Sequence, residues 1–152
     1  MLTTLKRLLV SALRRTNVLR WFNVSLRLQC ADRSLRVPLL GGIGAGHFSW
    51  ARREPWLSPL LRVLLQTKSG ALLDVGTNIG QTLIAHLETG IPSDYIGFEP
   101  NHCAASYFER FSRANRLDHL RFVPVGLSDR TSILKLFRNG EVSAGASTVE
   151  GF

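Results

Sequence analysis

The chain has 152 residues, of which 45% are hydrophobic and 20% are charged, a balance typical of one globular domain and not of a disordered segment. Its net charge of +8 is uneven: residues 1–40 hold eight Lys or Arg and one acid, whereas residues 41–152 hold eleven basic and ten acidic residues. A nucleic-acid-binding domain would spread basic side chains over a face of its fold, so we expect no nucleic-acid partner.

Residues 1–20 are predicted to form a basic amphipathic helix. Its apolar residues at helical spacing are Leu2, Leu5, Leu9, Ala12 and Leu13, with Lys6, Arg7 and Arg14 opposite. Three interpretations stay open: a helix packed on the domain, a helix lying on an anionic membrane surface, or an organelle-targeting peptide. Arg14 and Arg15 interrupt the apolar core that a secretory signal would need. No apolar run approaches the roughly 18 residues that span a bilayer.

Residues 21–54 are predicted to form a β-hairpin followed by a glycine-rich loop. Apolar and polar residues alternate over 24–30 and again over 35–39, as in strands with one buried face. Residues 41–46 contain four glycines but lack the Lys-Ser/Thr ending of a phosphate loop. We interpret them as a flexible loop that could form a lid over a cofactor site. His47 would then be either a surface or capping residue or a general base.

From residue 55 the pattern is that of alternating helices and strands. Residues 55–66 are apolar nearly all round, which predicts a helix buried beside the next strand. The apolar run 71–75 predicts a strand covered on both faces. A glycine-rich turn, a short helix and a second strand that ends in Glu99 follow. This order is typical of a βαβ unit that holds an adenosyl cofactor at the carboxyl ends of its strands.

The residues of this turn have separable uses. Gly76 permits a sharp turn, and Gly80 permits either close approach of a ligand or tight packing of helix on strand. Asn78 tolerates left-handed dihedral angles and can cap the following helix. Glu99 lies where a carboxylate can accept hydrogen bonds from both ribose hydroxyls. In the alternative interpretation, Asp74 and the glycines only shape a tight turn.

The spacing favours one cofactor over another. A dinucleotide fingerprint has the form G-x-G-x-x-G, but here Asn78 replaces the second glycine and Gly80 is the last. Asp74 would place negative charge beside a pyrophosphate, whereas S-adenosylmethionine carries a sulfonium and an amino group. We therefore expect S-adenosylmethionine. An NAD-linked oxidoreductase, which also has an acid after its second strand, is the alternative.

The remaining chain predicts a helix over 102–116, a third strand over 120–127 and a short strand over 133–137. The apolar face of this helix would hold Ala105, Phe108, Phe111 and Ala114. Cys30 and Cys103 are isolated and are predicted to be reduced thiols. No metal site is predicted, because the histidines are scattered. They are His47, His86, His102 and His119, and we expect surface or capping positions for them.

Three segments resemble motifs of the FkbM family of methyltransferases, which use S-adenosylmethionine and have the class I fold. They are LLDVGTNIGQT (72–82), YIGFEPN (95–101) and VPVGLSD (123–129), and segments 54–56 and 143–147 are also similar. The resemblance covers most of residues 35–152. It implies a Rossmann-like doubly wound sheet with the following cofactor contacts: Asp74, Gly76, Thr77, Asn78, Gly80 and Glu99, and beside the adenine Leu127 and Ser128.

The resemblance also sets the expected domain organisation. A class I sheet has about seven strands, and this sequence holds about three of them. We expect residues 55–152 to be the amino-terminal half of a Rossmann-like methyltransferase domain, truncated after about three core strands, with the helix of 1–20 and the hairpin of 21–54 before it. A partner chain could supply the missing strands.

The implied reaction is O-methylation of a hydroxyl group on a small molecule or glycan, and the catalytic residues cannot be assigned. Whether the 152-residue chain is active alone stays open. A non-catalytic fragment that acts at a membrane surface or binds a partner is a further alternative. We expect a cytoplasmic protein that can contact the membrane peripherally through residues 1–20.

Overall fold

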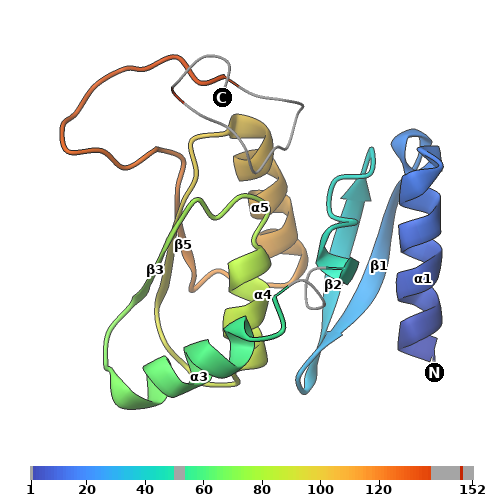
Figure 1. Cartoon of the computed structure of the whole chain (residues 1–152), viewed down its shortest axis with the longest axis horizontal. Coiled ribbons are helices and arrows are strands. Elements are labelled where there is room, and N and C mark those ends of the chain that lie inside the picture. The colour runs from blue at the N-terminus through green and yellow to red at the C-terminus, as the bar shows by residue number, and fades with distance from the viewer. Residues whose placement is uncertain (1, 50–53, 138–147, 149–152) are drawn as a thin grey trace.

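The structure is a computed structural model that describes residues 2–49, 54–137 and 148. It is a mixed α/β fold (Figure 1). In chain order its elements are α1 (Leu2–Arg15), the 3-10 helix η1 (Val18–Trp21), β1 (Asn23–Cys30), β2 (Arg33–Leu40), α3 (Leu57–Thr67), β3 (Leu72–Val75), α4 (Gln81–Glu88), β4 (Tyr95–Phe98), α5 (His102–Ala114) and β5 (Arg121–Val123).

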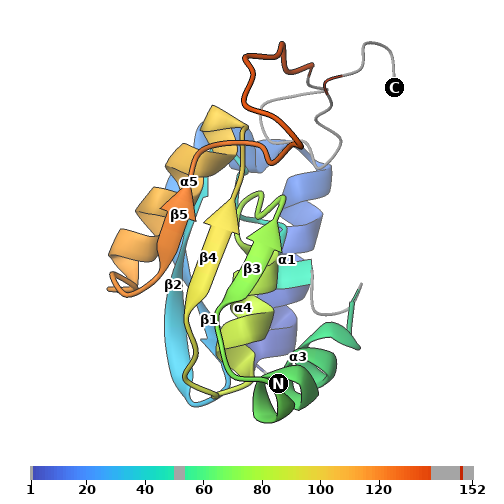
Figure 2. The ribbon, with the colours of Figure 1, turned by 90° about the vertical axis from the view of Figure 1, so that its left-hand side faces the viewer.

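A three-stranded parallel sheet forms the centre of the α/β part. Its strand order is β3-β4-β5, with Leu72 opposite Tyr95 and Ile96 opposite Arg121. Helices α4 and α5 connect successive strands and lie on one face of the sheet (Figures 1 and 2). The predicted α/β class with parallel strands is therefore confirmed.

The strand predicted over 133–137 was wrong. Residues 131–136 carry no regular secondary structure, and Ile133 is fully exposed. Alternation of apolar residues produces a strand only where a neighbouring strand completes the hydrogen-bond ladder. The third strand, β5, also ends earlier than the predicted residue 127, at Val123.

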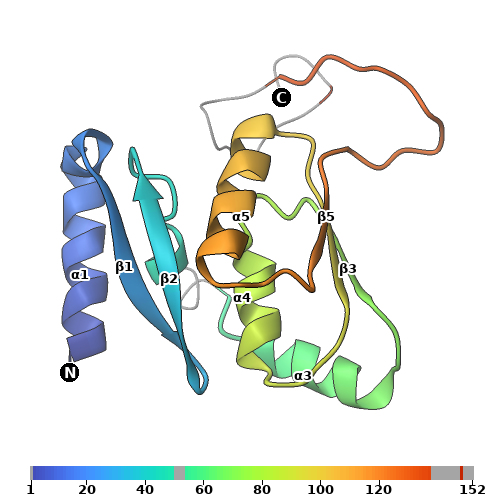
Figure 3. The same ribbon diagram turned by 180° about the vertical axis from the view of Figure 1, so that it is seen from behind.

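The predicted hairpin is confirmed. β1 and β2 pair antiparallel from Asn23–Leu40 to Cys30–Arg33 around a two-residue turn. Asn115, at the end of α5, fastens the hairpin to the α/β part: its Oδ1 accepts the Arg36 N–H at 2.6 Å, and its Nδ2 donates to the Arg36 carbonyl at 2.8 Å. Helix α1 lies on the opposite side of the hairpin from α4 and α5 (Figures 1 and 3).

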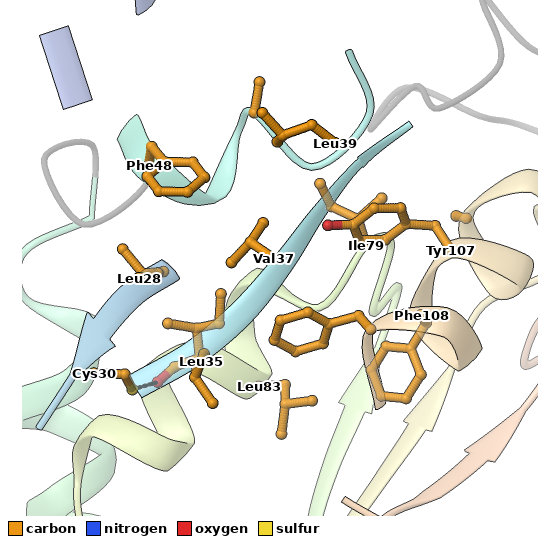
Figure 4. Close-up of a cluster of buried hydrophobic side chains, with 14 of the residues drawn as sticks. Leu28, Cys30, Leu35, Val37, Leu39, Phe48, Ile79, Leu83, Tyr107 and Phe108 are labelled. Carbon is orange, nitrogen blue, oxygen red and sulfur yellow. Dashed lines mark hydrogen bonds between the residues drawn. The ribbon is translucent and has the colours of Figure 1, made fainter. Parts of the chain in front are cut away.

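One hydrophobic core joins the hairpin to the α/β part. Leu28 and Val37 of the hairpin pack with Leu83 of α4 and Phe108 of α5 (Figure 4). Val10 of α1 belongs to the same cluster. The boundary that we placed between residues 54 and 55 therefore does not separate two independent cores.

Helix α1 buries a different face from the predicted one. Val10 is buried and Leu13 partly buried, whereas Leu9 is 58% exposed and Ala12 is exposed. In the part of the chain that the structure describes, no helix is long and apolar enough to cross a membrane.

The glycine-rich loop is not a lid. Ala45, His47 and Phe48 are buried, and a Cβ at Gly44 would overlap the Pro38 carbonyl and the Tyr107 hydroxyl. The glycines here allow close packing of the loop against β2 and α5. The prediction of a flexible segment over a cofactor site was therefore wrong.

The second face of the parallel sheet is open in the described part of the chain (Figure 2). On the edge strand β3, Leu73 is 59% and Val75 is 65% exposed, so the expectation of a strand covered on both faces was wrong. Helix α3 packs on α4 through buried Leu61, and Ser58 donates a hydrogen bond to Glu88 at 2.6 Å. The predicted burial of the whole helix was also wrong, because Leu60, Val63 and Leu64 of α3 are exposed.

Candidate functional site

The turn between β3 and α4 is fixed to the carboxyl end of β4. The backbone N–H groups of Gly76 and Thr77 both donate to the Phe98 carbonyl, at 2.9 and 3.1 Å. Asn78 adopts the predicted left-handed conformation, with φ of 49°. It does not cap the helix, however: α4 begins at Gln81, and Gly80 occupies the N-cap position. The turn therefore spans the tips of two adjacent parallel strands, the usual place for a ligand in such sheets.

The two glycines of the turn serve different purposes. A Cβ at Gly80 would lie 3.3 Å from the Phe108 ring, so Gly80 allows close packing of the turn against α5. This is the second of the two uses that the sequence left open. A Cβ at Gly76 would meet nothing within 4 Å, and Gly76 has a φ of 83°. Open space therefore lies over the backbone at Gly76.

Glu99 connects the turns that follow β3 and β4. One carboxylate oxygen accepts the backbone N–H of Asn78 at 2.9 Å, and the other accepts that of Asn101 at 2.8 Å. The residue is 7% exposed. An ionised carboxylate has about four acceptor sites, so two stay available after these contacts. The two backbone contacts hold the carboxylate still, and the two remaining sites suit a vicinal pair of hydroxyl groups.

Asp74 lies beneath the turn and not at its outer surface. Its carboxylate accepts the Tyr95 hydroxyl in the core, and the residue is 9% exposed. Burial, together with the charge of Asp74, raises the pKa of Tyr95 well above its usual range. Asp74 thus has a partner within the core. This contact favours the interpretation that Asp74 shapes the turn over the interpretation that it contacts a cofactor.

Thr77 and Gly97 form a close contact that we did not predict. Thr77 is 1% exposed, and its hydroxyl donates to the Asp74 carbonyl at 3.0 Å. A Cβ at Gly97 would lie 2.5 Å from this hydroxyl oxygen. Gly97 is therefore needed so that the turn can pack on β4. A glycine inside an apolar strand was the available signal, because such a glycine often marks close backbone approach.

Two asparagines complete the site. Asn101 is 1% exposed, and its Oδ1 accepts the Cys103 N–H at 3.1 Å, which caps α5. An asparagine directly before a helix was the sequence signal for this cap. The Asn78 Oδ1 is buried without a hydrogen-bond partner among the described residues. A buried unpaired acceptor costs about 1–3 kcal/mol, so a ligand that donates a hydrogen bond here would be stabilised.

Leu127 and Ser128 lie beyond the end of β5, in a segment without regular secondary structure. Leu127 is 54% exposed, and Ser128 is exposed. Both line a cavity of about 690 Å³ whose wall includes Pro100, Val125 and Ile133. The structure therefore brings Gly76, Asn78 and Glu99 together and leaves Leu127 and Ser128 on an adjoining cavity.

The other reactive side chains are structural. His47 is 3% exposed and stacks on Phe111 at 5.4 Å, and burial lowers its pKa to about 3. A neutral core histidine is neither the suggested general base nor the surface residue we expected, so both interpretations were wrong. His86 is also buried, and burial lowers its pKa. Cys30 and Cys103 are both reduced thiols, as predicted, and burial raises the pKa of Cys30 to about 12.

Among the described residues, no group of three or more His, Cys, Asp or Glu is placed to hold a metal ion. No protein-family model matches the chain, and no curated protein or solved structure matches it either. Any assignment of function therefore depends on the motifs and on the geometry of the turn around Glu99.

Proposed function

We propose that the chain binds S-adenosylmethionine at the carboxyl ends of β3 and β4 and serves as part of a methyltransferase of the class I, FkbM-like type. One observation carries the proposal: Glu99 is fixed by two backbone N–H groups and keeps about two acceptor sites, beside open space over Gly76. Its support in the sequence is the set of three motifs (72–82, 95–101 and 123–129).

The described residues suggest how each part of the cofactor would be held. Glu99 would accept the two ribose hydroxyl groups, because its remaining acceptor sites are adjacent. The Oδ1 of Asn78, which is buried and unpaired among the described residues, would have to turn toward the cofactor to accept a hydrogen bond from the amino group of the methionine moiety. The cavity beside Leu127 and Ser128 is the place for the adenine. The buried carboxylate of Asp74 would act through its charge and through the shape of the turn.

The bound cofactor supplies an electrophilic methyl group on a sulfonium. The chain's own contribution would be positioning, in which the ribose and the amino group are fixed so that the methyl group faces an acceptor oxygen. We propose a hydroxyl group of a small molecule or glycan as the acceptor, from the resemblance alone. The acceptor and its base would belong to the side of the sheet beyond β3, where Leu73 and Val75 are exposed.

An NAD-linked oxidoreductase is the alternative, and the position of Asp74 bears on it. Because this carboxylate is paired with Tyr95 in the core, it does not face the space where a pyrophosphate would lie. The case against NAD therefore depends on Asn78, which stands in the place of the second glycine of a dinucleotide fingerprint. A side chain at this position would hinder the close approach of a pyrophosphate to the backbone.

Isothermal titration calorimetry separates the two cofactors. The chain is titrated with S-adenosylmethionine, with its demethylated product S-adenosylhomocysteine and with NAD under the same conditions. The proposal predicts heat of binding for the two adenosyl compounds and none for NAD. Binding of NAD without binding of S-adenosylhomocysteine would replace it with the oxidoreductase alternative.

A further inference from the structure

A second surface, independent of the cofactor site, lies around the junction of α1 and β1. Six apolar side chains are exposed there although each belongs to a regular element or borders one. We call this group the N-terminal apolar surface; it consists of Leu8 (53% exposed), Leu9 (58%), Val18 (38%), Trp21 (84%), Phe22 (53%) and Val24 (42%). Exposed large apolar residues that gather in one region mark interaction sites more often than single ones do.

The local backbone places four of these exposed side chains in two pairs. In a 3-10 helix, residues three apart lie on one side, so Val18 and Trp21 of η1 share a side, while Leu19 between them is buried at 5% exposure. Phe22 is extended, with φ of −127°, and leads into β1. It therefore projects on the same side as Val24, two residues later.

Helix α1 adds a second apolar stripe to this region. Its inner side buries Val10, yet Leu8 and Leu9 are both more than half exposed. The helix contacts η1 and lies on the hairpin side away from the parallel sheet (Figures 1 and 3). Leu8 and Leu9 are therefore separated from the site at Glu99 by the hairpin and by α4 and α5.

The chain segment that carries this surface has charges of one sign. Residues 1–31 contain six basic residues, and the first acid of the chain is Asp32. Arg15 and Arg27 are exposed, at the end of α1 and in β1. Basic residues are attracted to the negative surface of an anionic bilayer, and Trp side chains favour the interface between headgroups and acyl chains. The remaining chain is nearly neutral, so the attraction would orient the molecule.

We infer that the N-terminal apolar surface docks the protein on an anionic lipid bilayer. Trp21, Phe22 and Val18 enter the interface at headgroup level, Leu8 and Leu9 extend the contact along α1, and the surrounding arginines pair with anionic headgroups. Of the three interpretations that the sequence left open, this one combines two: α1 packs on the domain through Val10 and also presents an outer side to the membrane. The inference does not depend on the proposed cofactor.

The test is cosedimentation of the full chain with vesicles of phosphatidylserine and phosphatidylcholine, and with vesicles of phosphatidylcholine alone. The double variant Trp21→Ser, Phe22→Ser is compared with the parent and with Trp56→Ser. Trp56 is a matched control because it is an exposed tryptophan, at 57%, in the nearly neutral part of the chain. Thermal unfolding checks that all variants fold, which we expect because the three side chains are more than half exposed.

The parent protein should sediment with the anionic vesicles, and added salt should weaken this binding. It should bind vesicles of phosphatidylcholine alone poorly. The double variant should bind at least about tenfold more weakly, since it loses two large apolar side chains, and Trp56→Ser should bind like the parent. Equal binding by the double variant and the parent overturns the inference. So does equal loss in Trp56→Ser, or salt-sensitive binding to short RNA or DNA without binding to vesicles. Calorimetric titration of S-adenosylhomocysteine into the double variant tests cofactor binding separately. Loss of membrane binding can therefore be told apart from failure of the proposed function.

Discussion

Gly76 and Gly90 form a matched pair for testing where the cofactor approaches the backbone. Both have a positive φ, 83° at Gly76 and 68° at Gly90, and a Cβ at either position would meet nothing within 4 Å. Gly76 lies in the turn beside Glu99, whereas Gly90 follows the other end of α4. Gly76→Ala and Gly90→Ala therefore impose the same kind of backbone strain at the two ends of one helix.

The expected magnitudes differ for stability and for binding. Alanine in a left-handed conformation costs about 1–2 kcal/mol, so both variants should lose a similar amount of unfolding free energy in urea. Only at Gly76 should the added methyl group meet the cofactor. Forcing a methyl group into a packed contact costs about 1–3 kcal/mol, which raises Kd by roughly 5-fold to 150-fold.

The assay is calorimetric titration of S-adenosylhomocysteine into both variants and the parent, at a temperature where all three are folded. Gly90→Ala should bind like the parent, and Gly76→Ala should bind more weakly by the stated factor. If Gly76→Ala binds with the parent's affinity, the open space over Gly76 is not the cofactor site. Equal weakening in both variants would mean that strain alone lowers affinity.

Three further predictions concern the fold. Asn115→Ala removes the side-chain hydrogen bonds to both backbone groups of Arg36 and should lower the unfolding free energy by about 1–3 kcal/mol; an unchanged urea midpoint would contradict this anchor. Burial lowers the pKa of folded His47 to about 3 from about 6.5 in the unfolded chain, so the unfolded state binds the extra proton between these values and stability falls as pH decreases below about 6.5. His47→Phe should remove about 2 kcal/mol of the stability loss between about pH 7 and about pH 5, and equal losses in parent and variant would show that His47 titrates normally. Val75→Lys places a charge on the open edge strand, where Val75 is 65% exposed, and should reduce concentration-dependent self-association in sedimentation velocity; a parent that is monomeric at all concentrations would show that the edge is harmless.

The parts of the fold that follow from local rules could be predicted from the sequence. The turn after β3 contains Gly76, Asn78 and Gly80, all with positive φ, and those residue types tolerate this conformation wherever they occur. The hairpin pattern was equally local, because alternation fixes which side chains share a face. The strand predicted over 133–137 did not depend on local rules alone. A strand there needs a neighbouring strand to pair with, and the order of residues does not specify one.

Burial was harder to predict because it depends on what packs against an element. Residues 55–66 are apolar on all sides, yet α3 buries only Leu61, since α4 covers one side of it. The loop at 41–46 was predicted to be flexible for its glycines. In the structure the same lack of side chains lets it pack tightly against Tyr107, which takes His47 into the core.

At the candidate site, sequence spacing predicted the position of Glu99 but not its contacts. Spacing along a strand gives the end at which a residue lies, whereas the bonds to Asn78 and Asn101 join two separate turns. The sequence did contain a signal for the side of β3 on which Asp74 lies. Asp74 alternates with Leu73 and Val75, which are exposed. A period of two places Asp74 on the opposite, core-facing side of β3.

The measurement that tests the central claim most directly is a coupling between Glu99 and the ribose. Kd is measured for S-adenosylhomocysteine and for its analogue without the 2′-hydroxyl, on the parent, on Glu99→Gln and on the exposed control Glu109→Gln. Because a charged acceptor binds a hydroxyl more strongly than an amide does, removing the hydroxyl should cost the parent and Glu109→Gln about 1 kcal/mol more than Glu99→Gln, or roughly fivefold in Kd. The same penalty in all three proteins would show that Glu99 does not contact the ribose and would contradict the proposed site.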